Sequence, residues 1–335
     1  MALLKRGASK FPQVCLYHSS SGVVQFARES GLAPLWLLDK HERHMSLRIP
    51  ITAIALSLGI TISSFAANTA KVVRDNIGIQ LYSLRAMTAK EGAIPPLDLV
   101  KSWGLKEVET AGTGNLPAAD FKKLLDERGL KPVAAHVGYS LLEKDINAVI
   151  RDLKALGVTY GIVPSIPHKD DFDDAAALRA AEKFNAWAKA FEKAGIKFAY
   201  HPHGFEFRKS QTPGADTVFD VLIGATDPKL VSFEMDVFWV YHAGVDPVSL
   251  LKKYPTRWVA LHVKDMRKGA PRGATLGKAP PTDKVAVGHG EIDWPKLFNV
   301  AVNLGIKHFF IEDETLAPLD NIPKSIAYMK NLPLK

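Results

Sequence analysis

Three apolar runs of this sequence each end in a residue that can bind a metal ion. Asp236 closes one run, His262 lies at the end of another, and Glu312 closes a third. Carboxylate and imidazole groups are common ligands of divalent cations. In parallel α/β enzymes, buried strands present such groups at their carboxyl ends, where the site forms. The three residues therefore predict one divalent cation, whose charge would offset the repulsion between neighbouring carboxylates.

A fourth run leads into the segment His-Pro-His-Gly-Phe-Glu at 201–206, which offers several further ligands. We expect Glu206 to be the first metal ligand, with His203 or His201 as alternatives. Simpler roles exist for the other residues, because Asp236 could cap a helix and His262 could be a packed core histidine. The metal site is favoured because a barrel would bring all these strand ends around one axis.

Eight strand-like runs alternate with amphipathic helical patterns from residue 76 onward. Glycines at 104, 129, 157, 195 and 305 mark places where a helix stops and a strand begins. This number of strands within about 260 residues predicts a (β/α)₈ TIM barrel. A doubly wound sheet is the main rival, but it would normally carry a glycine-rich turn after the first strand, and residues 81–85 contain no glycine. The expected strands cover 77–84, 105–110, 131–137, 158–164, 196–201, 230–236, 258–264 and 307–312.

The segment 266–287 is long and rich in glycine, proline, lysine and alanine. It follows the strand that carries His262, so we expect it to lie over the carboxyl-terminal face of the barrel. It is either a substrate-covering loop or a tolerated disordered insertion.

The composition argues against a nucleic-acid-binding protein. Net charge is +8, but residues 1–67 hold seven Lys and Arg against three Asp and Glu, so half of the excess lies there. The remaining 268 residues have no run of five like charges. The hydrophobic content of 47% suffices for a large core.

The amino-terminal part is predicted to lie outside the barrel. Residues 45–67 combine a short basic start at Met45, an apolar stretch and small residues suited to signal-peptidase cleavage. We expect export to the periplasm, a barrel at 72–335, and no stable membrane insertion after signal removal. An uncleaved apolar helix or a membrane anchor is the alternative. Residues 1–44, which hold the single cysteine Cys15, have no evident role and are interpreted as a non-native extension.

Several motifs together resemble the sugar phosphate isomerase/epimerase family of the xylose-isomerase-like TIM barrel superfamily, over about 76–335. The superfamily also includes inosose dehydratases and enzymes that process 3-keto-glycosides. The motifs are HPHGFEF at 201–207, MDVFWV at 235–240, AGVDP at 243–247, LHVKD at 261–265 and VGHGEIDW at 287–294. The resemblance implies one divalent ion, manganese by preference with magnesium, cobalt or zinc as alternatives. Its ligands would be Glu206, Asp236, His262 and Glu312.

The same resemblance implies proton transfer beside a carbonyl, with Glu206 and Glu312 as the acid/base pair. We therefore expect an isomerase or epimerase. A 3-keto-glycoside lyase or hydrolase, or an elimination like that of inosose dehydratase, is the runner-up. No cluster suited to a phosphate is evident, so an unphosphorylated sugar or sugar derivative is the expected substrate. The candidate substrate-binding residues are Glu109, His136, His201, Trp239 and Lys264, for each of which a purely structural role is the alternative.

Two other classes compete with the enzyme hypothesis. A phosphodiesterase like the apurinic endonucleases would need more histidines at strand ends and a basic groove. A non-catalytic exported carbohydrate-binding barrel would have lost a metal ligand. The sequence does not define the oligomeric state.

Overall fold

The computed structural model describes residues 67–169 and 171–332. The predictions for residues 1–44, and for all but the last residue of 45–67, lie outside this part. The described chain begins with a helical segment at 67–75. No helix among the described residues is long and apolar enough to cross a membrane.

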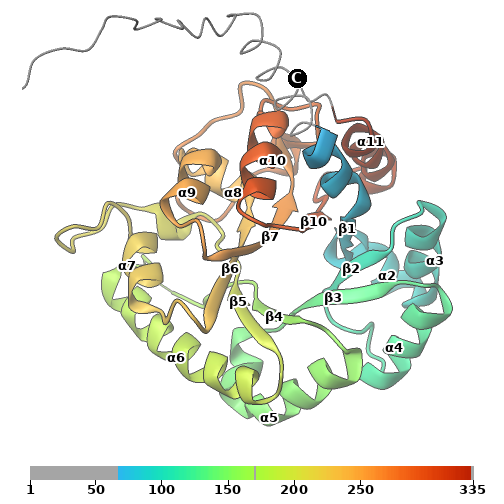
Figure 1. The fold of residues 1–335 in the computed structure, drawn as a ribbon, viewed down its shortest axis with the longest axis horizontal. Coiled ribbons are helices and arrows are strands. Elements are labelled where there is room, and N and C mark those ends of the chain that lie inside the picture. The colour runs from blue at the N-terminus through green and yellow to red at the C-terminus, as the bar shows by residue number, and fades with distance from the viewer. Residues whose placement is uncertain (1–66, 170, 333–335) are drawn as a thin grey trace, which may run out of the picture. The chain divides into compact units, whose positions relative to one another are not determined.

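Eight parallel strands form a closed barrel, as predicted (Figure 1). Each strand pairs with its neighbours in chain order, and the first pairs with the last, so that Ile77 lies opposite Phe309. The TIM barrel is thereby confirmed and the open sheet is excluded. The strands are β1 (Ile77–Gln80), β2 (Glu107–Thr110), β3 (Lys131–His136), β4 (Tyr160–Val163), β5 (Lys197–Tyr200), β6 (Val231–Asp236), β7 (Trp258–Val263) and β10 (His308–Ile311).

Helices surround the strands (Figure 1). The two longest, α5 and α6, bury apolar side chains along one face. In α6 the side chain of Asp173 caps the first turn by accepting the N–H of Ala176, and residues such as Phe184 and Phe191 are buried at helical spacing. Helix α5 ends at Gly157, whose φ of 70° suits glycine. The helices are α2 (Arg85–Glu91), α3 (Ile94–Ser102), α4 (Ala118–Glu127), α5 (Tyr139–Leu156), α6 (Asp174–Lys193), α7 (Val218–Ala225), α8 (Val237–His242), α9 (Pro247–Lys253), α10 (Trp294–Asn303) and α11 (Pro318–Lys330), with 3₁₀ turns η1 (Leu81–Leu84), η2 (Phe205–Phe207) and η3 (Pro281–Asp283).

An apolar layer closes the inside of the barrel below the strand ends. Side chains of this small cluster have almost no exposure, and Phe310 is its largest member. Gly78 makes room for that ring, because a Cβ atom at this position would lie 2.6 Å from a ring carbon of Phe310. The layer consists of Val133, Ala134, Ile162, Ala199, Ala260 and Phe310.

The segment after β7 is tied to the barrel by Asp265. Its strands β8 (Asp265–Met266) and β9 (Lys284–Val285) pair in antiparallel fashion. The Asp265 carboxylate accepts the backbone N–H groups of Gly288 and Gly290 at 2.9 and 3.0 Å, and the indole N–H of Trp294 at 2.9 Å. One buried side chain therefore fixes both ends of the predicted insertion.

Candidate metal and substrate site

The site lies one layer above the apolar floor of the barrel. Side chains along a strand alternate between the two faces, so a residue two positions after an inward-facing one also faces inward. Ala134, Ala199, Ala260 and Phe310 belong to the floor. The residues two positions after them form a polar layer at the carboxyl ends of the strands. That layer contains His136, His201, His262 and Glu312.

The centre of the polar layer is the carboxylate of Glu234. Its Oε2 atom lies 3.0 Å from Nδ1 of His201, 3.2 Å from Nε2 of His136 and 3.1 Å from Nε2 of His262. Glu234 has no solvent exposure, and its Oε1 atom has no hydrogen-bond partner among the described residues. Burial alone would raise the pKa of Glu234, but the charge of His262 and the histidine hydrogen bonds hold this pKa well below its usual range.

Glu109, from β2, approaches two of these histidines, His136 and His262, at the same Nε2 atoms. It contacts Nε2 of His262 directly and accepts a hydrogen bond of 2.7 Å from the amide of Gln80. Burial and the nearby Glu234 carboxylate raise the pKa of Glu109. Because Glu109 is fully buried, the structure places it beneath the site, among the side chains that support it.

Above Glu234, the structure brings together the three residues predicted at strand ends. One ligand atom each of Asp236, His262 and Glu312 lies within 4.8 Å of the others. Nδ1 of His262 faces this group, at 3.3 Å from Oε2 of Glu312 and 4.0 Å from Oδ2 of Asp236. Nε2 of His201 approaches from the β5 side, at 3.7 Å from Oδ2 of Asp236.

The buried ammonium of Lys264 neutralises part of this negative charge. Its Nζ lies 3.0 Å from Oδ2 of Asp236 and 2.8 Å from Oε2 of Glu314, and it also contacts Glu312. Burial lowers the pKa of Lys264, but the carboxylates, Asp236 first, raise it well above its usual value. Lys284 adds a second ammonium, 3.0 Å from Glu314.

The donor set fits a divalent metal ion. Imidazole nitrogens and carboxylate oxygens converge, and Oδ2 of Asp236 is buried without a hydrogen bond of good geometry among the described residues. Asp236 and Glu312 contribute two carboxylates to this group, and the carboxylate of Glu234 lies on the other side of His262. A divalent cation would balance these charges and could leave one coordination position for an oxygen of a bound ligand.

The structure does not bring Glu206 to this group. Glu206 lies in η2, with its carboxylate bonded to the hydroxyl of Tyr200 and to the backbone N–H of His203 at 3.1 Å. Burial raises its pKa to about 7, although those hydrogen bonds act in the opposite direction. The identity of the first ligand therefore stays a prediction, and of the two histidine alternatives His201 has a nitrogen 3.7 Å from Asp236.

A cavity of about 350 Å³ opens above the polar layer. Three predicted residues line it, namely His136, His201 and Glu312, as does the alternative ligand His203. Trp239 does not line it. That ring is only 5% exposed and packs near His203 and the ammonium of Lys264. The remaining lining residues are Tyr82, Ala111, Pro164, Ser165 and Glu314.

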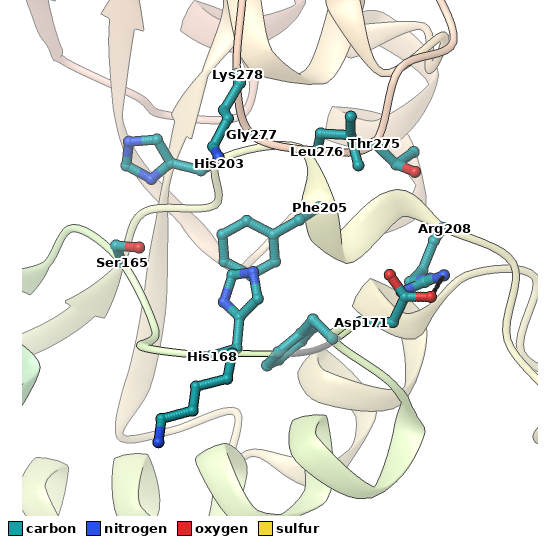
Figure 2. A pocket seen from close by; sticks show the side chains of 12 residues that line it. Ser165, His168, Asp171, His203, Phe205, Arg208, Thr275, Leu276, Gly277 and Lys278 are labelled. Atoms are coloured by element: carbon teal, nitrogen blue, oxygen red, sulfur yellow. Dashed lines mark hydrogen bonds and ion pairs between the residues drawn. The ribbon is translucent and has the colours of Figure 1, made fainter.

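A larger cavity of about 820 Å³ shares Ser165 and His203 with the first one. Figure 2 shows the ring of His168 over the ring of Phe205, whose centroids lie 4.3 Å apart. Residues 275–278 of the predicted insertion form the facing wall (Figure 2). This segment approaches closely, since a Cβ atom on Gly277 would lie 3.1 Å from the Phe205 ring.

Comparison with known proteins agrees with this architecture. The xylose isomerase-like TIM barrel family matches residues 97–332, which is more than half of the chain. The chain belongs to this family. As a xylose isomerase-like barrel, it is similar to a sugar phosphate isomerase/epimerase of Parabacteroides distasonis ATCC 8503, with 27% identity and a TM-score of 0.64 over 77% of this chain and 98% of the other.

The curated relatives of this xylose isomerase-like barrel match a smaller share of it. The inosose dehydratase of Bacillus cereus (strain AH820) is 26% identical over 164 residues, which are 47% of this chain and 53% of the relative. The chain thus spans about half the length of that relative. The rhizopine catabolism protein MocC of Rhizobium meliloti is 24% identical over 258 residues, 70% of this chain and 78% of the relative. The predicted family and its enzyme superfamily are confirmed.

Sequence analysis missed Glu234 and the second ammonium, Lys284. Glu234 lies inside an apolar run, between Phe233 and Met235, and not at its end. The available signal was its spacing, because it stands two residues before Asp236 and therefore faces the same side of β6.

Proposed function

We propose that this chain is a metal-dependent enzyme that moves a proton at the carbon beside the carbonyl of an unphosphorylated sugar or sugar derivative. The observation that supports this most is the grouping of Asp236, His262 and Glu312 directly beneath a cavity that Glu312 lines. A metal site buried in protein on one side and open to a cavity on the other suits catalysis on a small ligand.

The metal would be held by Asp236, His262 and Glu312, with His201 as the fourth ligand in place of Glu206. His201 is favoured because its Nε2 atom already faces Asp236. When bound, the ion would stabilise negative charge on the substrate oxygen. Mixed imidazole and carboxylate donors suit manganese, the predicted metal, and also cobalt or zinc.

Glu312 is the base in this proposal. Burial tends to raise its pKa, but Lys264 and His262 hold that pKa well below the usual range, so the carboxylate stays charged and able to accept a proton. Lys264 and Lys284 surround Glu314, which lines the same wall. His203 lines the cavity from the β5 side and is the candidate to exchange a proton there.

Two outcomes can follow from the same proton abstraction. Return of a proton to another carbon or face gives isomerisation or epimerisation. Loss of a group from the β-carbon gives elimination, and the relatives named inosose dehydratase favour this second candidate. The adjoining 820 Å³ cavity also favours it, because it offers room for a leaving group larger than water, as in a keto-glycoside.

The location of the protein belongs to the proposal as well. The basic and apolar pattern of residues 45–67 supports export to the periplasm. Cell fractionation with amino-terminal sequencing tests this, and a mature start outside about 65–72 would contradict it.

Metal analysis of the purified protein tests the proposed function. One divalent ion per chain is expected, and it should be lost in Asp236→Ala and in His262→Ala. A native chain that binds no divalent ion would contradict the metal-dependent mechanism. It would favour the alternative of a non-catalytic carbohydrate-binding barrel.

A further inference from the structure

The two candidate histidine ligands each lie between two layers of carboxylates. On the upper side, which is the side of the 350 Å³ cavity, Nε2 of His201 and Nδ1 of His262 face Asp236. On the lower side, Nδ1 of His201 and Nε2 of His262 face Oε2 of Glu234. A metal-binding imidazole must present a lone pair to the ion from one nitrogen, while its other nitrogen carries a proton.

The lower carboxylate determines which nitrogen carries that proton. An ionised carboxylate oxygen only accepts hydrogen bonds, so each nitrogen directed at Glu234 must be an N–H donor. In a neutral ring that donates to Glu234, the lone pair lies on the other nitrogen, which is Nε2 in His201 and Nδ1 in His262, and both of these nitrogens face Asp236. The carboxyl group of Glu109 contacts the same Nε2 of His262, so this nitrogen has two carboxyl groups beside it.

The position of Glu234 on β6 makes this arrangement rigid. Glu234 and Asp236 are two residues apart on the same face of one strand, so a single element carries both a metal ligand and the group that orients two others. His136 donates toward the same Oε2 atom at 3.2 Å, but its ring offers no atom to the group formed by Asp236, His262 and Glu312.

We propose that Glu234 is a positioning residue that fixes the tautomers of His201 and His262, so that Nε2 of the first and Nδ1 of the second face the metal ion. This inference rests on the proposed metal site. It assigns a role to a buried charge that neither touches the cavity nor belongs to the ligands named above.

The structure also defines the rival arrangement. His136, His201, Glu234 and His262 themselves have ligand atoms within 4.8 Å of one another. An ion bound there would use Glu234 as a ligand and would bind His262 through Nε2 instead of Nδ1. The two arrangements therefore differ in the protonated nitrogen of His262 and in the importance of His136.

Nitrogen NMR of the imidazole rings in the zinc-loaded protein tests the proposal. We expect the proton of His201 on Nδ1 and that of His262 on Nε2, with zinc on the other nitrogen of each ring. A proton on Nδ1 of His262 would overturn the proposal and place the ion in the lower group.

Calorimetric titration with cobalt(II) supplies the second readout. Glu234→Leu should weaken cobalt binding by about 10- to 100-fold, the usual effect of removing a carboxylate behind a histidine ligand. The cobalt affinity of Glu234→Gln should lie between those of the parent and Glu234→Leu, because glutamine keeps one acceptor oxygen. His136→Gln should change the affinity less than threefold, whereas in the rival arrangement it removes a ligand.

Glu107→Gln is the matched control. Glu107 also accepts from a histidine, His308 at 2.8 Å, but from a position two residues earlier on β2. Its variant should bind cobalt as the parent does. Parent protein that binds no metal would refute the proposed function, whereas unchanged binding by folded Glu234→Leu and Glu234→Gln would refute only the role of Glu234.

Discussion

Asp236 uses its two carboxylate oxygens for different purposes. Oδ1 accepts the backbone N–H of Trp239 at 3.0 Å and thereby caps helix α8, while Oδ2 faces His201, His262 and Lys264. The helix cap and the metal ligand, which were alternatives for this residue in the sequence, are compatible in one side chain.

This division predicts different results for two substitutions of Asp236. Asp236→Asn keeps a capping oxygen, whereas Asp236→Ala loses it, so the alanine variant should be less stable than the asparagine variant by about 1 kcal/mol. Both should lose tight metal binding, since neither retains the charge. Urea denaturation and metal titration measure the two effects. Metal affinity equal to the parent's in Asp236→Asn would remove this residue from the ligands.

Glu206 should make stability depend on pH in the metal-free protein. Its pKa is about 7 in the folded state and 4.5 for an ordinary glutamate, so the folded state binds the proton more tightly. Stability should therefore fall as pH rises from about 4.5 to 7, by a few kcal/mol from this group. In Glu206→Gln that loss should be absent. Denaturation curves at pH 5 and pH 7.5 provide the comparison, and an identical pH dependence in both proteins would show that Glu206 is not held protonated.

Lys264 should control the charge state of Glu312. Lys264→Met removes the ammonium that lowers the pKa of Glu312, and burial would then raise this pKa. The acid limb of any activity that needs ionised Glu312 should move to higher pH. Carbon NMR titration of the Glu312 carboxyl in metal-free protein measures the shift directly. Lys278→Met, on the wall of the larger cavity, is the control and should leave the Glu312 titration unchanged.

Gly290 should be intolerant of a side chain. A Cβ atom there would collide with the Asp265 carboxylate and with the carbonyl oxygen of Met266, and so disturb the bonds that fix the segment after β7. We expect Gly290→Ala to destabilise the protein by about 1–3 kcal/mol. Gly224→Ala is the control, because it lies in α7 with no atom within 4 Å of the added methyl, and it should be neutral or stabilising. Equal melting temperatures for the two variants would contradict this account of Asp265.

The barrel and three site residues could be predicted because each depends on local sequence patterns. A buried strand that stops at an ionisable residue marks its carboxyl end, and this placed Asp236, His262 and Glu312 together. All eight predicted strands are present in the closed barrel.

In the segment after β5, local sequence patterns do not suffice to identify the metal ligand. His201, His203 and Glu206 all follow the strand closely, and spacing alone does not say which side chain faces the axis. The chain turns at Gly204, with φ of 96°, and this turn directs Glu206 back to Tyr200. Glu234 could not be predicted as a site residue because it lies within a strand and not at its end. Its charge is balanced by histidines from three other strands, which the local sequence does not reveal.

Deuterium exchange tests the central claim most directly. The manganese-loaded protein in deuterated water should replace the hydrogen beside the carbonyl of at least one compound among ketoses, keto-inositols and 3-keto-glucosides. Exchange should stop after chelation of the metal and in Glu312→Gln. A metal-loaded native chain that causes no exchange, isomerisation or elimination across this panel would contradict the proposed proton transfer.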